Sequence, residues 1–82
     1  MTEIEILEKV KQALTEVCIF ALDANEIEPT DSLANDLGMD SMDMVSIIIR
    51  IEEAFMISIQ DVDAESWKTV QDICTYIQKQ QQ

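Results

Sequence analysis

The stretch Asp36–Met42, with the sequence DLGMDSM, joins a loop rich in turn-forming residues to the most apolar segment of the chain. It contains Gly38, the only glycine among 82 residues, and glycine suits a backbone position that needs a positive φ angle. Asp40 and Ser41 both favour the start of a helix. A hydroxyl at such a junction is exposed and close to free backbone N–H groups, so Ser41 is the candidate functional residue.

Length and composition predict one small domain over residues 1–82. Hydrophobic residues make up 48% of the chain, with few aromatics among them, which indicates an aliphatic core and not a disordered chain. No apolar run has the length of a membrane span, and the N-terminus lacks the basic and apolar regions of a signal peptide. We therefore expect a cytoplasmic monomer without membrane contacts.

The charge is strongly negative, with 17 acidic residues against 5 basic ones and a net charge of −12. Nucleic-acid phosphates and anionic membrane surfaces would be repelled, so neither is expected as a partner. Basic patches on proteins would be attracted. An acidic surface that only promotes solubility is the alternative interpretation.

Several classes of catalytic and metal site are excluded by composition. The chain has no histidine, so it cannot form a serine–histidine or cysteine–histidine pair. Cys18 and Cys74 are too few and too far apart for a zinc or iron–sulfur site, and their apolar surroundings predict that both are buried. We expect neither a metal site nor an enzyme.

Helical periodicity predicts a first helix over residues 3–18. Thr2 followed by Glu5 is the pattern of a capping box at a helix N-terminus. Apolar residues recur at spacings of three and four, which places them on one face. The predicted inner stripe consists of Ile4, Leu7, Val10, Leu14 and Val17.

Residues 21–40 are rich in turn formers, and Pro29 rules out a helix interior there. A loop this long in a compact domain is usually functional or disordered. Isolated apolar residues argue against disorder because they can tie the loop to the core, and Ser32 is placed to cap a short turn. The predicted anchors are Ile27, Leu33 and Leu37.

A second helix is predicted to begin at Asp40 or Ser41 and to end near Phe55. Its apolar arc is wider than one core face requires. Either this helix is nearly central in the fold, or part of its surface waits for a ligand or partner. If it lines a cavity with other segments, the candidate lining residues are Val45, Ile48, Ile49 and Trp67.

After the second helix the chain is predicted to form a loop that buries Ile57 and Ile59. A short helix over residues 60–66 and a last helix over residues 69–79 follow, with Trp67 as an apolar cover for the core. The predicted fold class is therefore all-α: a small four-helix bundle with three main helices, a short third helix, and a long loop between the first two.

A phosphoester on Ser41 would be well placed, because a helix N-terminus offers free N–H groups and a partial positive charge. A plain N-cap is the alternative role for Asp40 or Ser41. The surrounding sequence favours the attachment point over the plain N-cap. Asp36–Met42 is close to the D-L-G-x-D-S-L signature of acyl carrier proteins, which the chain resembles over nearly its whole length. The resemblance continues through residues 52–55 and 69–77.

The resemblance implies a 4′-phosphopantetheine arm that a phosphopantetheinyl transferase attaches to Ser41 from coenzyme A through a phosphodiester. The thiol of the arm, and not a cysteine of the chain, would carry acyl groups as thioesters. It would deliver them between acyl-transfer, ketosynthase or acyl-activating enzymes of fatty-acid, polyketide or related acyl biosynthesis. A cavity beside the second helix would then shelter the acyl chain.

The resemblance also implies that Asp40 helps the transferase to hold its magnesium ion, and that the second helix docks on basic patches of partners. The expected docking residues are Asp40, Met42, Asp43, Met44 and Ile47. Ser46 stands where many relatives have glutamate, and Arg50 adds a positive charge, which suggests a dedicated carrier with its own partners. An acidic regulatory module that binds proteins without a covalent arm is the alternative.

Overall fold

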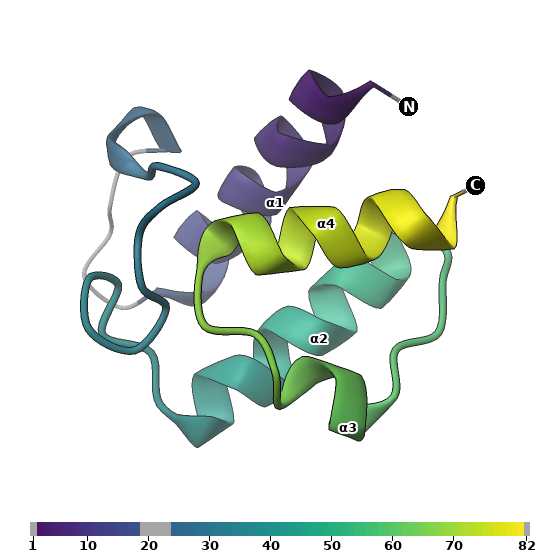
Figure 1. Ribbon diagram of the computed structural model, residues 1–82. Coiled ribbons are helices and arrows are strands. Elements are labelled where there is room, and N and C mark those ends of the chain that lie inside the picture. The colour runs from purple at the N-terminus through teal and green to yellow at the C-terminus, as the bar shows by residue number, and fades with distance from the viewer. Residues whose placement is uncertain (1, 19–23, 82) are drawn as a thin grey trace.

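The computed structural model describes residues 2–18 and 24–81 (Figure 1). These ranges contain four α-helices, one short 3-10 helix and no β-strand. The elements are α1 (Glu3–Val17), η1 (Ala24–Glu26), α2 (Ser41–Phe55), α3 (Asp61–Ala64) and α4 (Val70–Gln80). The prediction of a small all-α bundle with a short third helix is confirmed. The 3-10 helix was not predicted, and the start of the predicted loop, at residues 21–23, lies outside the described residues.

Side chains in the flanking sequence fix where the helices begin. The Thr2 hydroxyl accepts a hydrogen bond of 3.2 Å from the Glu5 N–H, but the Glu5 carboxylate accepts from the Thr2 hydroxyl. Only one half of the predicted capping box therefore forms. At α2 the box is complete: the Asp40 carboxylate accepts from the Asp43 N–H at 2.9 Å, and the Asp43 carboxylate accepts from the Asp40 N–H at 3.2 Å. Loss of such a cap costs about 1 kcal/mol.

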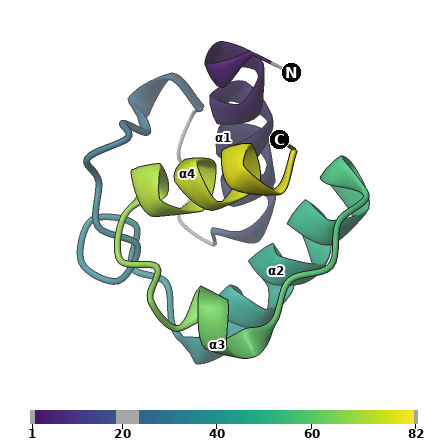
Figure 2. The ribbon, with the colours of Figure 1, turned by 45° about the vertical axis from the view of Figure 1, so that its right-hand side comes forward.

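Helices α1, α2 and α4 enclose one aliphatic core, and α3 lies beside the N-terminal half of α2 (Figure 2). The prediction that Ile4 belongs to the inner stripe of α1 is wrong, because Ile4 is 69% exposed. At 100° per residue, Ile4 lies about 120° around the helix from the buried Val10. The residues of α1 that are buried are Ile6, Val10, Ala13 and Leu14.

The long connection before α2 is packed against the bundle, as predicted. Its backbone pairs with the chain just before α4: the Leu33 N–H donates to the Lys68 carbonyl at 2.9 Å, and the Val70 N–H donates to the Asp31 carbonyl at 3.1 Å. The predicted anchors are confirmed as buried, and a fourth, Met39, joins them. These anchors are Ile27, Leu33, Leu37 and Met39.

The segment between α2 and α4 also contributes side chains to the core. Ile59 is buried as predicted, but Ile57 is only partly buried, because it lies at the edge of the core. Trp67 covers the core as expected, and its ring meets Tyr76 edge to face, with centroids 5.5 Å apart. The Tyr76 hydroxyl donates to the Asp63 carboxylate at 3.2 Å. These contacts tie α3 to α4.

Candidate functional site

The turn before α2 presents Ser41. Gly38 has a φ of 66°, the left-handed conformation that its lack of a Cβ permits. The Met39 N–H donates to the Leu33 carbonyl at 2.9 Å, and the Met39 side chain is buried. Asp40 is the N-cap, so Ser41 is the first residue of α2 and is exposed. Of the two helix starts predicted, the structure selects the one with Asp40 as cap.

Ser41 lies at the positive end of the α2 dipole. Within the described chain, no hydrogen-bond acceptor reaches the N–H groups of Ser41 and Met42, whereas Asp40 occupies the N–H of Asp43. Two free N–H groups beside an exposed hydroxyl fit a phosphate ester. The nearby carboxylates of Asp40 and Asp43 would repel the phosphate, but one oxygen of each carboxylate accepts a hydrogen bond of the capping box.

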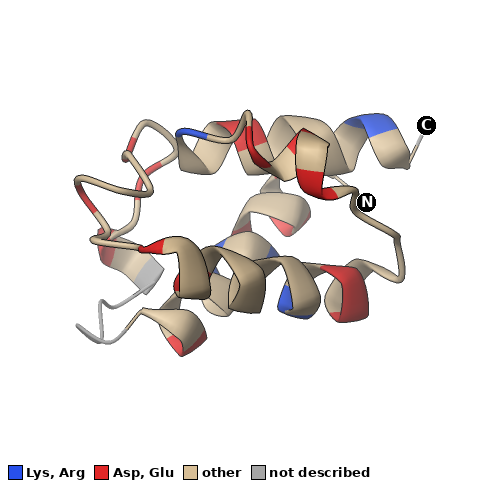
Figure 3. Cartoon of the chain, turned by 90° about the horizontal axis from the view of Figure 1, so that it is seen from below, with Lys and Arg blue, Asp and Glu red and all other residues tan. Residues whose placement is uncertain are grey.

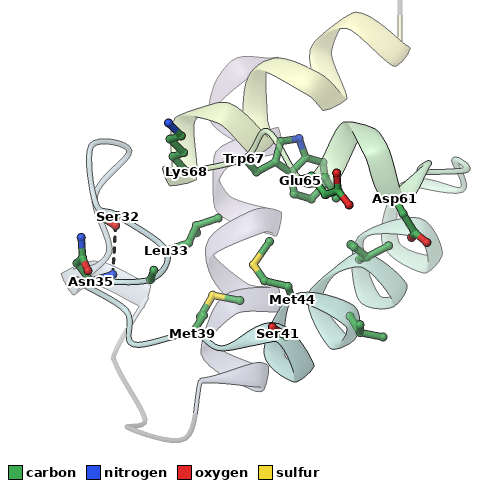
Figure 4. Close-up of a pocket in the computed structure, with 14 residues that line it drawn as sticks. Ser32, Leu33, Asn35, Met39, Ser41, Met44, Asp61, Glu65, Trp67 and Lys68 are labelled. Atoms are coloured by element: carbon green, nitrogen blue, oxygen red, sulfur yellow. Dashed lines mark hydrogen bonds between the residues drawn. The ribbon is translucent and has the colours of Figure 1, made fainter.

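Ser41 lies on the rim of an open cavity of about 640 Å³. The cavity lies between the loop before α2, the first half of α2, and α3 with the connection that follows it (Figure 4). Its apolar wall consists of Leu33, Ala34, Met39, Met44, Val45, Ile48, Ala64 and Trp67. The rim is polar and consists of Ser32, Asn35, Ser41, Asp61, Glu65 and Lys68.

Of the residues predicted to line a cavity, Val45, Ile48 and Trp67 do so. Ile49 does not line it; this residue is 49% exposed on the outer surface of α2. Ile48 and Ile49 differ by 100° around the helix, and only the former points toward α3.

The expected docking residues differ in how exposed they are. Met42 is 79% exposed, Asp40 is exposed, and Asp43 and Met44 are partly buried. Ile47 is wrong as a docking residue, because it is 0% exposed in the core face of α2 that also includes Ile51 and Phe55. Two further apolar residues of α2, Val45 and Ile49, are exposed as well.

Acidic side chains occur on every α-helix, whereas cations are few (Figure 3). Arg50 of α2 forms a salt bridge of 2.6 Å with Glu16 of α1. No helix in the described ranges is long and apolar enough to span a membrane. The same ranges contain no group of three or more side chains suited to hold a metal ion.

Both cysteines are free and buried, as predicted. Burial raises the pKa of the Cys74 thiol to about 11, and burial followed by the nearby charge of Asp43 raises the pKa of the Cys18 thiol. Since the thiolate is the reactive form, neither side chain is suited to carry an acyl group.

Comparisons with known proteins agree with this geometry. The family model described as "Phosphopantetheine attachment site" matches residues 8–77. An acyl carrier protein of Thermosynechococcus vestitus is 42% identical over 77 residues, which cover 94% of this chain and 93% of the relative. An acyl carrier protein of Helicobacter hepaticus is 39% identical over 74 residues, which cover 90% and 95%. The chain therefore belongs to the acyl carrier protein family.

Membership of this family makes the chain a non-catalytic carrier of acyl groups with a covalently attached 4′-phosphopantetheine. It also makes a phosphopantetheinyl transferase and acyl-processing enzymes its general classes of partner. The alternative of an acidic regulatory module without an arm is not favoured.

Proposed function

We propose that Ser41 is the residue that carries the phosphopantetheine arm. The observation that carries this proposal is the position of its exposed hydroxyl at the start of α2, on the rim of the apolar cavity. Once bound, the group supplies a terminal thiol that holds acyl groups as thioesters. The role of the chain is to present the hydroxyl, to stabilise the phosphate with the N–H groups of α2, and to shelter the acyl chain.

The attachment step uses coenzyme A and the hydroxyl of Ser41. The Ser41 Oγ forms a bond to the phosphorus on the pantetheine side of the coenzyme A pyrophosphate, and the bond between that phosphorus and the bridging oxygen breaks. The leaving group is 3′,5′-adenosine bisphosphate, and the hydroxyl proton passes to a base. This chain has no histidine that could act as the base.

Asp40 has a separate task in the same step. One of its carboxylate oxygens accepts from the Asp43 N–H, and no hydrogen bond within the described chain involves the other. That free oxygen is the magnesium ligand that the chain offers to the transferase. Asp40 thus fixes the start of α2 and contributes charge to attachment.

The cavity beside Ser41 is the shelter for the acyl chain. Its wall is apolar and reaches from the helix start to Trp67. An acyl chain that folds back from the arm would move its apolar surface from water onto this apolar wall. The hydrophobic effect therefore favours an acyl chain inside the cavity.

The wider assignment follows from the family and from the departures of this chain. It is a single, monomeric, cytoplasmic carrier domain over residues 1–82 that serves fatty-acid, polyketide or related acyl biosynthesis. Its partners include acyl-transfer, ketosynthase or acyl-activating enzymes with basic patches. Asp40, Met42, Asp43 and Met44 belong to the surface that docks on them.

The proposal is tested by incubation of the purified protein with coenzyme A, magnesium and several transferases. Intact-mass spectrometry should show one added phosphopantetheine in the wild type and in Ser46→Ala. The latter is a matched control because Ser46 is an exposed serine of the same helix. Ser41→Ala should gain nothing. Modification of Ser41→Ala, or an unmodified wild type with every transferase, would refute the assignment of Ser41.

A further inference from the structure

The rim of the apolar cavity separates hydrogen-bond donors from acidic groups. Asp61 is the first residue of α3 and Glu65 is its C-cap, so the α3 side of the rim is acidic. The opposite side contains Lys68 and two neutral side chains of the loop before α2, Ser32 and Asn35 (Figure 4). Among the described residues that line the cavity, Lys68 is the only cation. We call Ser32, Asn35 and Lys68 the donor edge.

Backbone hydrogen bonds hold the donor edge together. The Leu33 N–H donates to the Lys68 carbonyl at 2.9 Å, which joins the loop before α2 to the chain before α4. The Ser32 hydroxyl accepts from the Asn35 N–H at 3.1 Å, which fixes the turn between them. Neither bond uses the ammonium group of Lys68 or the side-chain amide of Asn35. These two groups are therefore held at one place by the backbone and remain available to a ligand.

The ammonium group of Lys68 has no ionic partner within the described chain, because the salt bridge found there joins Arg50 to Glu16. The Asp72 carboxylate at the start of α4 accepts instead from the backbone N–H groups of Lys68 and Thr69, at 2.8 and 3.0 Å. The chain has 5 basic residues against 17 acidic ones. An unpaired cation at the edge of the acyl cavity is therefore an exception to the acidic character of the protein.

We propose that the acyl groups carried by this chain end in a carboxylate, which the donor edge binds. The proposal rests on the proposed function, because the arm at Ser41 must deliver the acyl chain to the cavity. Figure 4 shows Ser41 at the start of α2 and Lys68 across the apolar wall from it. An acyl chain that follows this wall away from Ser41 brings its far end to the donor edge. The ligand class is a dicarboxylic acid, with one carboxyl group in the thioester and the other free.

The charge of the protein explains why such a chain needs a donor edge. The net charge of −12 repels a carboxylate, but salt screens exposed charges that lie more than about 8 Å away. An ammonium group in direct contact, with neutral donors beside it, forms short charge-assisted hydrogen bonds. A chain with a methyl end makes no use of these donors. A chain with an ammonium end is repelled by Lys68 and attracted to Asp61 and Glu65.

The test loads three eight-carbon groups on the arm from their coenzyme A thioesters: octanoyl, octanedioyl and 8-aminooctanoyl. The measured quantity is the gain in the thermal unfolding midpoint relative to the same variant with an unloaded arm. On the wild type, the gain from octanedioyl should exceed that from 8-aminooctanoyl. Lys68→Gln should reduce the gain from octanedioyl by about 4 °C, the size expected of an ion pair at the surface of a small domain. It should leave the gain from octanoyl unchanged.

Lys79→Gln is the matched control, because it removes the same charge from an exposed lysine of α4 outside this cavity. It should leave all three gains unchanged. The effect of Lys68→Gln on octanedioyl should shrink between about 50 mM and about 500 mM salt, since salt screens a pair at the rim.

Four results would overturn the proposal. They are an unchanged octanedioyl gain in Lys68→Gln, an equal loss for octanoyl, an equal loss in Lys79→Gln, and a larger wild-type gain from 8-aminooctanoyl than from octanedioyl. The last result would assign the acidic side of the rim to a cationic chain end. Failure of the proposed function gives different results: a chain that does not take the arm on Ser41 is detected by mass, and a cavity that shelters no acyl chain shows no gain with octanoyl.

Discussion

An acyl chain on the arm should stabilise the fold in proportion to its length. The perturbation is a series of acetyl, butyryl, hexanoyl and octanoyl groups loaded on the arm. A water-sized group occupies about 30 Å³, so a cavity of about 640 Å³ has room for every chain in this series. Each chain can therefore extend along the wall between Ser41 and Trp67 without displacing core side chains.

The magnitude follows from the burial of methylene groups. A fully buried methylene contributes about 0.8 kcal/mol, and we take half of this, about 0.4 kcal/mol, because the cavity is open to solvent on one side. The octanoyl chain has six more methylenes than the acetyl chain, so it should raise the free energy of unfolding by about 2–3 kcal/mol. For a domain of this size, the unfolding midpoint should rise on the order of 10–20 °C.

The assay is urea and thermal unfolding followed by the fluorescence of Trp67, the only tryptophan, which lines the cavity. Ala34→Phe should flatten the dependence on chain length, because its ring would occupy the cavity that Ala34 lines. Ala54→Phe is the matched control, since Ala54 is exposed on α2 outside this cavity. Equal stability for all four acyl groups on the wild type would refute the reasoning and place the acyl chain in solvent.

Three further perturbations separate the roles of individual side chains. Asp40→Asn should keep the cap and the stability of the fold but slow arm attachment on the order of tenfold. Asp40→Ala should slow attachment as well and also lower the free energy of unfolding by about 1 kcal/mol. Equal attachment rates in the wild type and in Asp40→Asn would contradict a role of Asp40 in magnesium binding. Thiol titration of the native protein should detect no fast-reacting thiol before the arm is attached and one afterwards. The reason is that burial raises the pKa of Cys18 and that of Cys74, the latter to about 11. A fast-reacting thiol in the protein without the arm would contradict this prediction. The hydrogen bond from the backbone N–H of Lys68 is the largest cause that holds the pKa of Asp72 below its usual value. The stability lost in Asp72→Asn should therefore be constant above about pH 5 and shrink as the pH falls below about 4, through the pKa of the folded state. A difference in stability between wild type and variant that is unchanged at about pH 3 would contradict this explanation.

The sequence predicted the local features best, because each depends on residues near in the chain. The turn at Gly38 and the short turn that Ser32 caps follow from side-chain and backbone preferences that operate within a few residues. The Ser32 hydroxyl accepts from the Asn35 N–H at 3.1 Å, as the pattern indicated. The position of Ser41 at a helix start is a consequence of these local rules.

The rotation of the helices could not be predicted in the same way. In α2 almost every position between Ser46 and Glu52 is apolar, so the pattern does not distinguish the buried Ile47 from the exposed Ile49. The face that is buried is set by contacts with α1, which is distant in sequence. For the same reason the sequence did not distinguish Ile48, which lines the cavity, from Ile49, which does not.

The central claim is that this chain carries acyl groups on an arm at Ser41. The most direct measurement is mass spectrometry of the protein purified from its native host, first intact and then as peptides. We predict one phosphopantetheine, with or without an acyl group, on the peptide that contains Ser41. A native protein without the arm, or an arm attached to any other residue, would contradict the claim.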